Sequence, residues 1–554
     1  MLHREISGLH EAAYLLGVAA IASQLLALLR DRIFAYTFGA SRTLDIYYAA
    51  FRIPDLIFVS IASVVSISIL LPFFIEKFKE GEATGKRFVD ASFSIFFAAI
   101  VVISFLAYIC IPFLTPFAFP GFYSPVVKAQ LVMLARIMLL SPILLGISNF
   151  LASITQMYNR FFIYALSPLL YNLGIIIGAL FFYPLFGISG LAFGVVLGAG
   201  LHCLVQVPFI LERKLFPRLR LPLEWRTVRK LVILSLPRTL ALSANQIATF
   251  FLVSMASLMS VGSIAVFNFS WNLQSVPLSI VGASYASAAF PALSRYISQG
   301  LRDTFLEQMI ISTRHILFWS IPMMALFVVL RAQIVRTILG AGNFSWSDTR
   351  LTAACLAIFI LSVVPQSLLL LFVRGYYALG KTKKPLIINV VTSVFLIFLG
   401  YIFIYLFKTF DTFRFFLENL FKVDSLPGSI VLVLPLAYSV GTTINALVHW
   451  IAFQREFPSF TRPVFKTLFA SFSSSVIMGY VAYLFLDIFD NIFNINTVLG
   501  VFLQGFCSGV LGIAAGILVL VLMKNQEIRE IWKAFHHRIW KTKVIGADPV
   551  DALL

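Results

Sequence analysis

Long hydrophobic segments, separated by short charged ones, form the dominant pattern along the chain. Fourteen of these segments are long enough to cross a bilayer, because about 20 helical residues cover the hydrocarbon core. We therefore predict an all-α polytopic membrane protein with about fourteen transmembrane helices. The expected spans are 12–37, 46–75, 91–118, 131–156, 162–184, 188–211, 229–259, 262–293, 311–340, 351–380, 385–407, 429–454, 464–488 and 496–523.

The composition supports this prediction. Of the 554 residues, 60% are hydrophobic and 12% are charged, whereas soluble domains carry about 25% charged residues. A water-soluble globular protein is therefore excluded. The four cysteines and seven histidines show no spacing typical of a disulfide framework or a metal site, so we expect no cofactor and no bound metal.

The positive charges are unevenly distributed among the expected loops. If the amino terminus is cytoplasmic, 29 Lys and Arg residues fall on the inner side and 8 on the outer side. Because cytoplasmic loops of membrane proteins are enriched in Lys and Arg, we predict that both termini are cytoplasmic. The net charge of +18 is then a property of the loops, and we expect no nucleic-acid partner.

Two short patterns recur at nearly the same offset, which indicates an internal repeat. Pro72 lies nine residues before Gly81, and Pro291 lies nine residues before Gly300. The sequence Pro-Leu-Leu-Tyr-Asn at 168–172 is matched by Pro-Leu-Ile-Ile-Asn at 385–389. Transporters are often built from duplicated helix bundles. We therefore predict two six-helix lobes in the same orientation.

The repeat also sets the expected domain boundaries. The amino-terminal lobe covers 1–220, the carboxy-terminal lobe covers 221–460, two extra helices cover 461–524, and a basic cytoplasmic tail covers 525–554. Within the second lobe, segment 408–428 mixes aromatic and charged residues at near-helical spacing. It is either an amphipathic helix on the outer membrane surface or a structured loop.

Charged residues inside the expected spans are concentrated near the amino terminus. A charge at mid-bilayer costs about 2.5–3.5 kcal/mol, so such residues usually line a cavity or serve a function. Arg30 is deep in its span and is our candidate for binding phosphate, with Asp31 beside it. Arg52 and Asp55 are equally consistent with a structural role. Arg238 faces either a cavity or the cytoplasmic headgroups.

Several of these residues belong to motifs that resemble the MurJ (MviN) family of lipid II flippases, within the multidrug/oligosaccharidyl-lipid/polysaccharide exporter superfamily. The resemblance covers the first twelve expected spans. The motifs are Arg30-Asp31, Phe38-Gly39, Asp45, Tyr48-Ala49-Ala50-Phe51-Arg52-Ile53-Pro54, Asn159-Arg160-Phe161, Ser167-Pro168 with Asn172, and Tyr377-Ala378-Leu379-Gly380-Lys381-Thr382 with Pro385.

The resemblance implies a function for these residues. A member of this family moves lipid-linked peptidoglycan precursor across the bacterial cytoplasmic membrane, by alternating access of two lobes around a cationic cavity. Arg30, Asp31, Arg52 and Arg238 are then expected to bind the diphosphate of the substrate, and Asp45 and Asp55 to act in gating. The expected partners are this lipid-linked glycan and the membrane lipids, whereas the oligomeric state stays open.

The chain also departs from the family pattern. Neutral residues stand at several positions where relatives carry charged ones, namely Gln24, Phe58, Val59, Ser63 and Asn272. Fewer arginines would suit a substrate with less phosphate, so another polyprenyl-linked saccharide is an alternative cargo. A non-transporting membrane scaffold that acts through its basic loops is a further alternative. An enzyme is not expected, because no nucleophile or paired-carboxylate motif is present.

Overall fold

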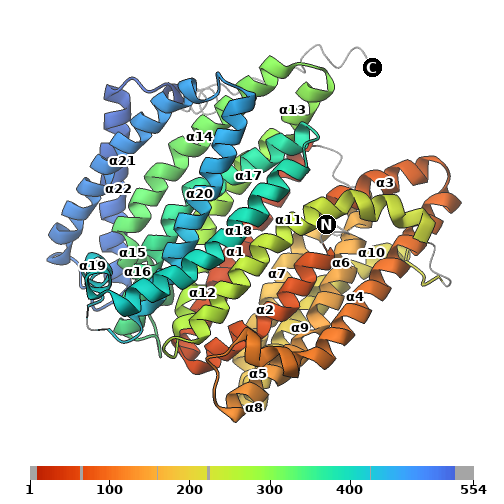
Figure 1. Ribbon diagram of the computed structural model, residues 1–554, viewed down its shortest axis with the longest axis horizontal. Coiled ribbons are helices and arrows are strands. Elements are labelled where there is room, and N and C mark those ends of the chain that lie inside the picture. Colours follow the sequence, from red (N-terminus) through yellow and green to blue (C-terminus); the bar gives the residue numbers. More distant parts are fainter. Residues whose placement is uncertain (1–8, 63–66, 159, 221–224, 425, 531–554) are drawn as a thin grey trace.

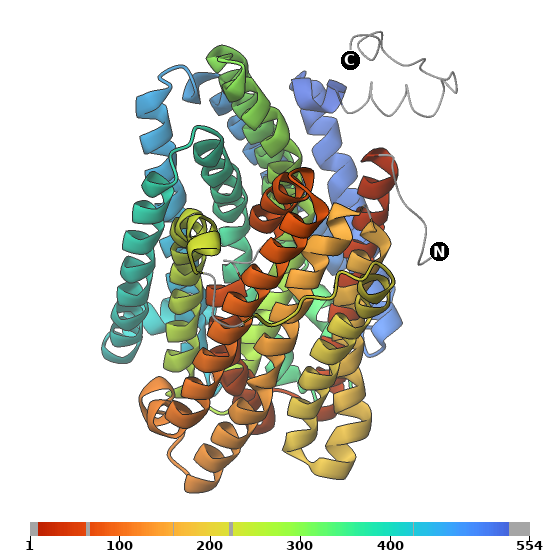
Figure 2. The ribbon, with the colours of Figure 1, turned by 90° about the vertical axis from the view of Figure 1, so that its right-hand side faces the viewer.

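The structure is a computed structural model that describes residues 9–62, 67–158, 160–220, 225–424 and 426–530. Over these residues every regular element is a helix and there is no strand. Figures 1 and 2 show long helices running roughly side by side, as expected when each must satisfy its own backbone hydrogen bonds in a bilayer. The predicted all-α fold class is confirmed.

Long apolar stretches and their glycine and proline interruptions define the helices. The first half contains α1 (Leu9–Phe38), α2 (Arg42–Ala62), α3 (Ile67–Lys79), α4 (Glu82–Ala118), α5 (Pro125–Met138), α6 (Leu140–Met157), α7 (Phe161–Ile177), η1 (Gly178–Phe182), α8 (Tyr183–Phe186), α9 (Ile188–Leu204) and α10 (Val207–Glu212). The second half contains α11 (Trp225–Ser257), α12 (Ser263–Pro277), η2 (Leu278–Ala283), α13 (Ser284–Ser298), α14 (Arg302–Val329), α15 (Arg331–Leu339), α16 (Trp346–Phe359), η3 (Ile360–Ser362), α17 (Val363–Ala378), α18 (Lys383–Thr409), α19 (Asp411–Phe421), η4 (Ser429–Leu432), α20 (Val433–Glu456), α21 (Thr461–Asp490) and α22 (Val498–Leu522).

Eleven helices in the described part of the chain are long and apolar enough to cross a membrane. They coincide with eleven of the fourteen expected spans. The other three expected spans, 12–37, 46–75 and 229–259, fall on α1, on α2 with α3, and on α11. Each of these includes residues or side chains outside the described part, so the count of fourteen stays a prediction.

The helices gather into two groups in space. Figure 1 shows α2–α10 on one side and α12–α22 on the other. Two helices contact both groups: α1 packs on α7 and on α15, and α11 packs on α2, α4 and α18. The expected boundaries of the lobes at 220/221 and 460/461 stay a prediction, as does the separate status of the last two helices.

The turn between α1 and α2 requires a glycine. Gly39 has a φ of +61°, and a Cβ atom there would lie 2.4 Å from the carbonyl oxygen of Asn343. The Asn343 amide donates a hydrogen bond of 2.9 Å to the carbonyl of Tyr36. A side chain at position 39 would therefore push apart the end of α1 and the loop before α16.

Segment 408–428 contains the short helix α19. Its residues Leu417 and Glu418 are buried, and Ser429 donates a hydrogen bond of 2.6 Å to the Glu418 carboxylate. One face of α19 therefore packs on the protein, while Phe415, Phe416 and Leu420 are exposed. The position of this helix on a membrane surface stays a prediction.

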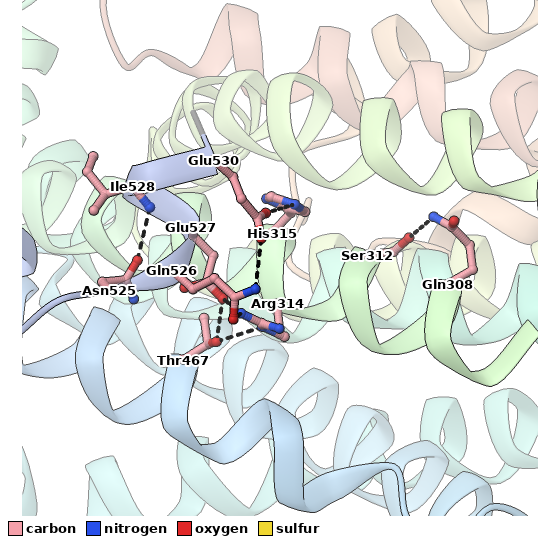
Figure 3. Close-up of polar contacts among 10 residues, drawn as sticks. All are labelled: Gln308, Ser312, Arg314, His315, Thr467, Asn525, Gln526, Glu527, Ile528 and Glu530. Carbon is pink, nitrogen blue, oxygen red and sulfur yellow. Dashed lines mark hydrogen bonds and ion pairs between the residues drawn. The ribbon is translucent and has the colours of Figure 1, made fainter. Parts of the chain in front are cut away.

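The chain segment that follows α22 returns to the body of the second half. Figure 3 shows Glu527 between Arg314 of α14 and Thr467 of α21. Arg314 forms an ion pair of 2.7 Å with Glu527, and the Thr467 hydroxyl donates to the same carboxylate at 2.6 Å. His315 lies 3.6 Å from Glu530. These contacts tie the carboxyl end of α22 to two other helices. The rest of the expected basic tail, residues 531–554, lies outside the described residues.

Candidate functional site

A cavity of about 220 Å³ lies where α1, α2 and α7 meet α12. It is therefore built from both groups of helices. Its wall combines charged, amide and aromatic side chains, which is the usual character of a ligand site. The residues that line it are Arg30, Phe34, Tyr47, Tyr48, Phe51, Arg52, Asp55, Tyr171, Ile175, Asn268, Trp271 and Asn272.

Arg30 lies at the wall of this cavity and is held from two directions. Its Nε and Nη2 atoms donate to Asp31 Oδ1 at 3.0 and 2.8 Å, and its Nη1 atom donates to Asn172 Oδ1 at 3.1 Å. Asp31 thus neutralises the guanidinium charge, and Asn172 of α7 fixes its direction. Because the side chain keeps 19% of its surface exposed, Arg30 can also bind an anion in the cavity.

Asp31 is buried and does not line the cavity. Its second carboxylate oxygen accepts a hydrogen bond of 2.9 Å from Asn272 of α12. Asp31 therefore connects Arg30 to the opposite group of helices. The sequence predicts this carboxylate among the substrate-binding residues, and that role stays a prediction. The structure places Asp31 behind Arg30, where it orients the guanidinium.

Arg52 of α2 lines the same cavity as Arg30 of α1. Its Nη2 atom donates to Asn268 Oδ1 of α12 at 2.5 Å. Asp55 also lines the cavity and accepts a hydrogen bond from Gln246 of α11. Among the described residues, no ion pair joins Arg52 to a carboxylate. Arg52 therefore lacks a direct ion pair of the kind that joins Arg30 to Asp31, although Asp55 in the same wall attracts its charge.

Asp45 lies away from the cavity, at the amino end of α12. Its carboxylate accepts hydrogen bonds from the backbone amides of Gly262 at 2.7 Å and of Ala265 at 3.1 Å. An anion is favourable there because the first amides of a helix have no partner within the helix and the helix dipole is positive at this end. Asp45 therefore fastens α2 to α12.

Further contacts of α1 and α11, the two helices between the groups, lie on the same side of the cavity as Asp45. Arg32 donates to the carbonyls of Thr337 and Ile338 at 2.6 and 3.1 Å. The amide of Gly121 donates to Ser257 Oγ at 3.3 Å. Each of these contacts involves a backbone group, and together they close the cavity on this side.

The structure thus brings Arg30, Arg52 and Asp55 to one cavity and leaves Asp31 and Asp45 outside it. Arg238 belongs to α11, but its side chain lies outside the described residues. No group of three or more His, Cys, Asp or Glu residues in the described part of the chain is placed to hold a metal ion.

Sequence reasoning missed the neutral members of the site. Asn268, Trp271 and Tyr47 carry no charge, so nothing distinguished them from packing residues in an apolar segment. Asn172 was visible as part of the repeated Pro-x-x-x-Asn pattern, which gave it no role beyond the repeat. Its hydrogen bond to Arg30 depends on the packing of α7 against α1.

A bundle of membrane-crossing helices, with a charged cavity enclosed between two groups of helices, is the arrangement of a membrane transporter. The family model described as "Lipid II flippase MurJ" matches residues 34–503. The chain belongs to this family, as the resemblance in its motifs predicted.

Individual relatives agree with this assignment. The chain is 25% identical over 384 residues to a probable lipid II flippase MurJ of Buchnera aphidicola subsp. Schizaphis graminum. The matched region covers 68% of this chain and 74% of that protein. It is 25% identical over 404 residues to the lipid II flippase MurJ of Burkholderia cenocepacia, covering 69% and 76%.

Solved structures share the fold. An inward closed conformation of lipid II flippase MurJ covers 94% of this chain and all of that chain, with a TM-score of 0.72 and 22% identity. An inward-facing multidrug resistance MATE transporter covers 79% of this chain and 96% of that chain, with a TM-score of 0.64 and 15% identity.

Proposed function

We propose that this protein is a flippase that moves lipid-linked peptidoglycan precursor, lipid II, from the inner to the outer leaflet of the bacterial cytoplasmic membrane. Membership of the family supports the proposal. The observation that carries it is the position of Arg30 and Arg52, which line one cavity between the two groups of helices.

Two guanidinium groups at one cavity suit a diphosphate. Each can donate parallel hydrogen bonds to phosphate oxygens, and each stays charged at any physiological pH. Asn268 and Asn272 of α12 supply amide groups at the same wall, which suits the hydroxyl and carbonyl groups of a sugar headgroup. Transport of this kind breaks no covalent bond, so the site needs no nucleophile or general base.

Movement of the two groups relative to each other follows from the size of the cavity. Its volume of about 220 Å³ is below the 300–1,000 Å³ typical of sites that enclose a drug-sized ligand. It can take a diphosphate, but not the whole headgroup of a lipid-linked glycan. We infer that α12 separates from α1 and α2 to admit the substrate, and that Asp45 leaves the amino end of α12 when the outer side opens.

The proposed orientation places both termini in the cytoplasm and the Asp45 contact on the outer side. Its support is the excess of Lys and Arg in the expected inner loops. In this orientation, the contacts of Asp45, Arg32 and Gly121 close the outer exit. The lipid tail of the substrate would lie along the second lobe, whose expected spans 11 and 12, like the two extra spans that follow, carry almost no charge in their interiors.

One observation, the neutral residues near the site, favours an alternative cargo. Asn272 binds Asp31, and Gln24 of α1 donates to Ser279 at 3.1 Å. With only two arginines at the described wall, a polyprenyl-linked saccharide with less phosphate charge is the alternative substrate.

Depletion of the protein in its own cells tests the proposal. If the protein is the flippase, lipid II accumulates in the inner leaflet and the fraction open to an externally added modifying enzyme falls. An unchanged distribution of lipid II, with a second lipid-linked saccharide accumulating instead, would select the alternative cargo. An unchanged distribution of every lipid-linked glycan would contradict transport by this protein.

A further inference from the structure

A second and larger cavity, of about 510 Å³, shares no lining residue with the first and lies at the end of the second half where α14 stops and α15 begins. Its wall comes from five helices of this half. The residues that line it include Arg331, Trp346, Arg350, Lys422, Tyr483, Asp487 and Asp490. Figure 1 shows α15, α16 and α19 close together at this end of the molecule, beside α21 and α22.

The charges around this cavity are separated by sign. The basic residues Arg331, Arg350 and Lys422 come from α15, α16 and the end of α19, whereas both acidic residues come from the last turns of α21. Within the described part of the chain, no ion pair joins a basic residue of this wall to Asp487 or Asp490. Arg350 instead binds the Lys422 carbonyl and lies 3.8 Å from Asp424.

One face of α21 leads from the membrane-crossing part of that helix into this cavity. Residues at spacings of three and four lie on one face of a helix. On α21, one such series consists of five apolar residues, each more than half exposed, followed by the two carboxylates. Its members are Phe469, Phe472, Val476, Tyr480, Tyr483, Asp487 and Asp490.

This face is apolar along most of its length and acidic at its carboxyl end, so it matches a ligand with a long apolar tail and a polar head. From Phe469 to Tyr483 the apolar part rises about 21 Å, at about 1.5 Å per residue, which exceeds the thickness of one leaflet of hydrocarbon, about 15 Å. The cavity begins where the apolar part ends, because Tyr483, the last apolar residue of the series, also lines the cavity. An apolar tail along α21 therefore places a polar head in the cavity.

We propose that this cavity binds the headgroup of a phospholipid that carries both a phosphate and a primary ammonium group. The phosphate contacts the basic wall of Arg331, Arg350 and Lys422, and the ammonium group contacts Asp487 and Asp490. The two carboxylates disfavour the binding of a headgroup that carries a negative charge and no ammonium group.

The proposal is tested with the full-length protein in detergent, by native mass spectrometry during titration with lipids of identical acyl chains. We expect phosphatidylethanolamine to bind about tenfold more tightly than phosphatidylcholine or phosphatidylglycerol, the difference expected from one charge-assisted contact. Equal binding of the three lipids would overturn the proposal.

Variants of each wall test which one contacts the phosphate and which one contacts the ammonium group. The double change D487N/D490N should remove the preference for phosphatidylethanolamine over phosphatidylglycerol, whereas D487E/D490E should keep it and so controls for folding. The double change R331Q/R350Q should weaken the binding of all three lipids. The exposed pair Asp411 and Arg414 of α19, at 2.9 Å, provides the matched control, and D411N/R414Q should change nothing. A preference that survives D487N/D490N would contradict the assignment of the acidic wall.

A soluble competitor separates a lipid from a free solute. Free phosphoethanolamine has the same charged groups but no tail. We expect it to displace the lipid only at concentrations at least a hundredfold higher, because it forgoes the apolar contact along α21. Equal affinity of phosphoethanolamine and phosphatidylethanolamine would show that the cavity takes a solute, and would overturn the lipid assignment.

Discussion

The two arginines of the central cavity differ in how their charge is compensated. Arg30 pairs with Asp31 and with the amide of Asn172, whereas Arg52 contacts the neutral amide of Asn268. Arg52 has no carboxylate in direct contact, so an incoming phosphate competes with fewer existing contacts at Arg52 than at Arg30. At Arg30 the phosphate competes with Asp31. This competition can keep binding reversible, which a transporter requires in order to release its cargo.

The role of Asp31 can be tested by the change D31N. It keeps the shape of the side chain and removes the competing charge. We expect tighter binding of undecaprenyl diphosphate, together with a loss of about 1.5–3 kcal/mol in stability of the unliganded protein, because Arg30 loses its charged partner. Binding and melting temperature of the purified variant check both effects. Weaker binding in D31N would contradict the competition between Asp31 and phosphate.

The sequence located the charged residues of the site and missed its neutral ones. Arg30, Arg52 and Asp55 stand out because a charge within an apolar segment is rare and costly. Asn268 and Tyr171 do not stand out, since neutral polar and aromatic residues are common in membrane helices. Only the packing of α7 and α12 against α1 and α2 shows that they share a cavity.

At the level of elements, the contact between Asp45 of α2 and the amino end of α12 is the clearest link between the two groups. The change D45N removes the charge that the helix dipole favours, at a cost of about 1 kcal/mol. We expect the outer side to open about fivefold more often. The rate at which a thiol reagent labels a cysteine introduced at Ala40, which lies against Gly262, measures this opening. An unchanged labelling rate in D45N would show that Asp45 does not hold the gate.

The cluster around Glu527 is a structural link between α14, α21 and the segment after α22. Burial raises the pKa of the Glu527 carboxyl, but the hydrogen bonds from Thr467 and Arg314 outweigh it, and the pKa lies below its ordinary value. Its contribution to stability is therefore complete at neutral pH and is lost as the pH falls below about 4.3.

The change E527Q tests this link. We expect a lower melting temperature at pH 7, by the equivalent of about 1.5–3 kcal/mol, and a smaller difference from the wild type at pH 4 than at pH 7. The exposed residue Glu80, which pairs with Lys77 at 2.6 Å, supplies the control, and E80Q should change little. A difference between E527Q and wild type that grows on acidification would contradict the direction of the pKa shift.

At the scale of the whole molecule, the proposed mechanism requires the two groups of helices to separate on each side in turn. Ser60 of α2 and Ser243 of α11 have hydroxyl oxygens 3.0 Å apart, on the side of the cavity opposite to Asp45. We expect S60C/S243C, in a background without the four native cysteines, to form a disulfide that stops transport. Reduction should restore it, and each single variant should be active. Full transport by the oxidised double variant would show that this side does not open.

The sequence predicted the membrane-crossing helices more completely than it predicted the residues of the site. Hydropathy located the eleven helices that the described residues identify as membrane-crossing, because a bilayer imposes length and composition on each span. The repeat indicated two halves, but it could not show that α12 lines the cavity of the first half. Residues such as Asn268 and Arg52 are 216 positions apart, and their contact is a result of tertiary packing.

The central claim is that Arg30 and Arg52 together bind the diphosphate of the substrate inside the cavity between the two halves. The most direct measurement is the affinity of purified protein for undecaprenyl diphosphate, compared among the wild type, R30Q, R52Q and R136Q. Arg136 does not line the cavity, and its Nε donates to the Tyr108 carbonyl, so R136Q is the control for loss of one positive charge. The account predicts that R30Q and R52Q each weaken binding at least about tenfold, while R136Q does not. Equal affinity of all four proteins would contradict it.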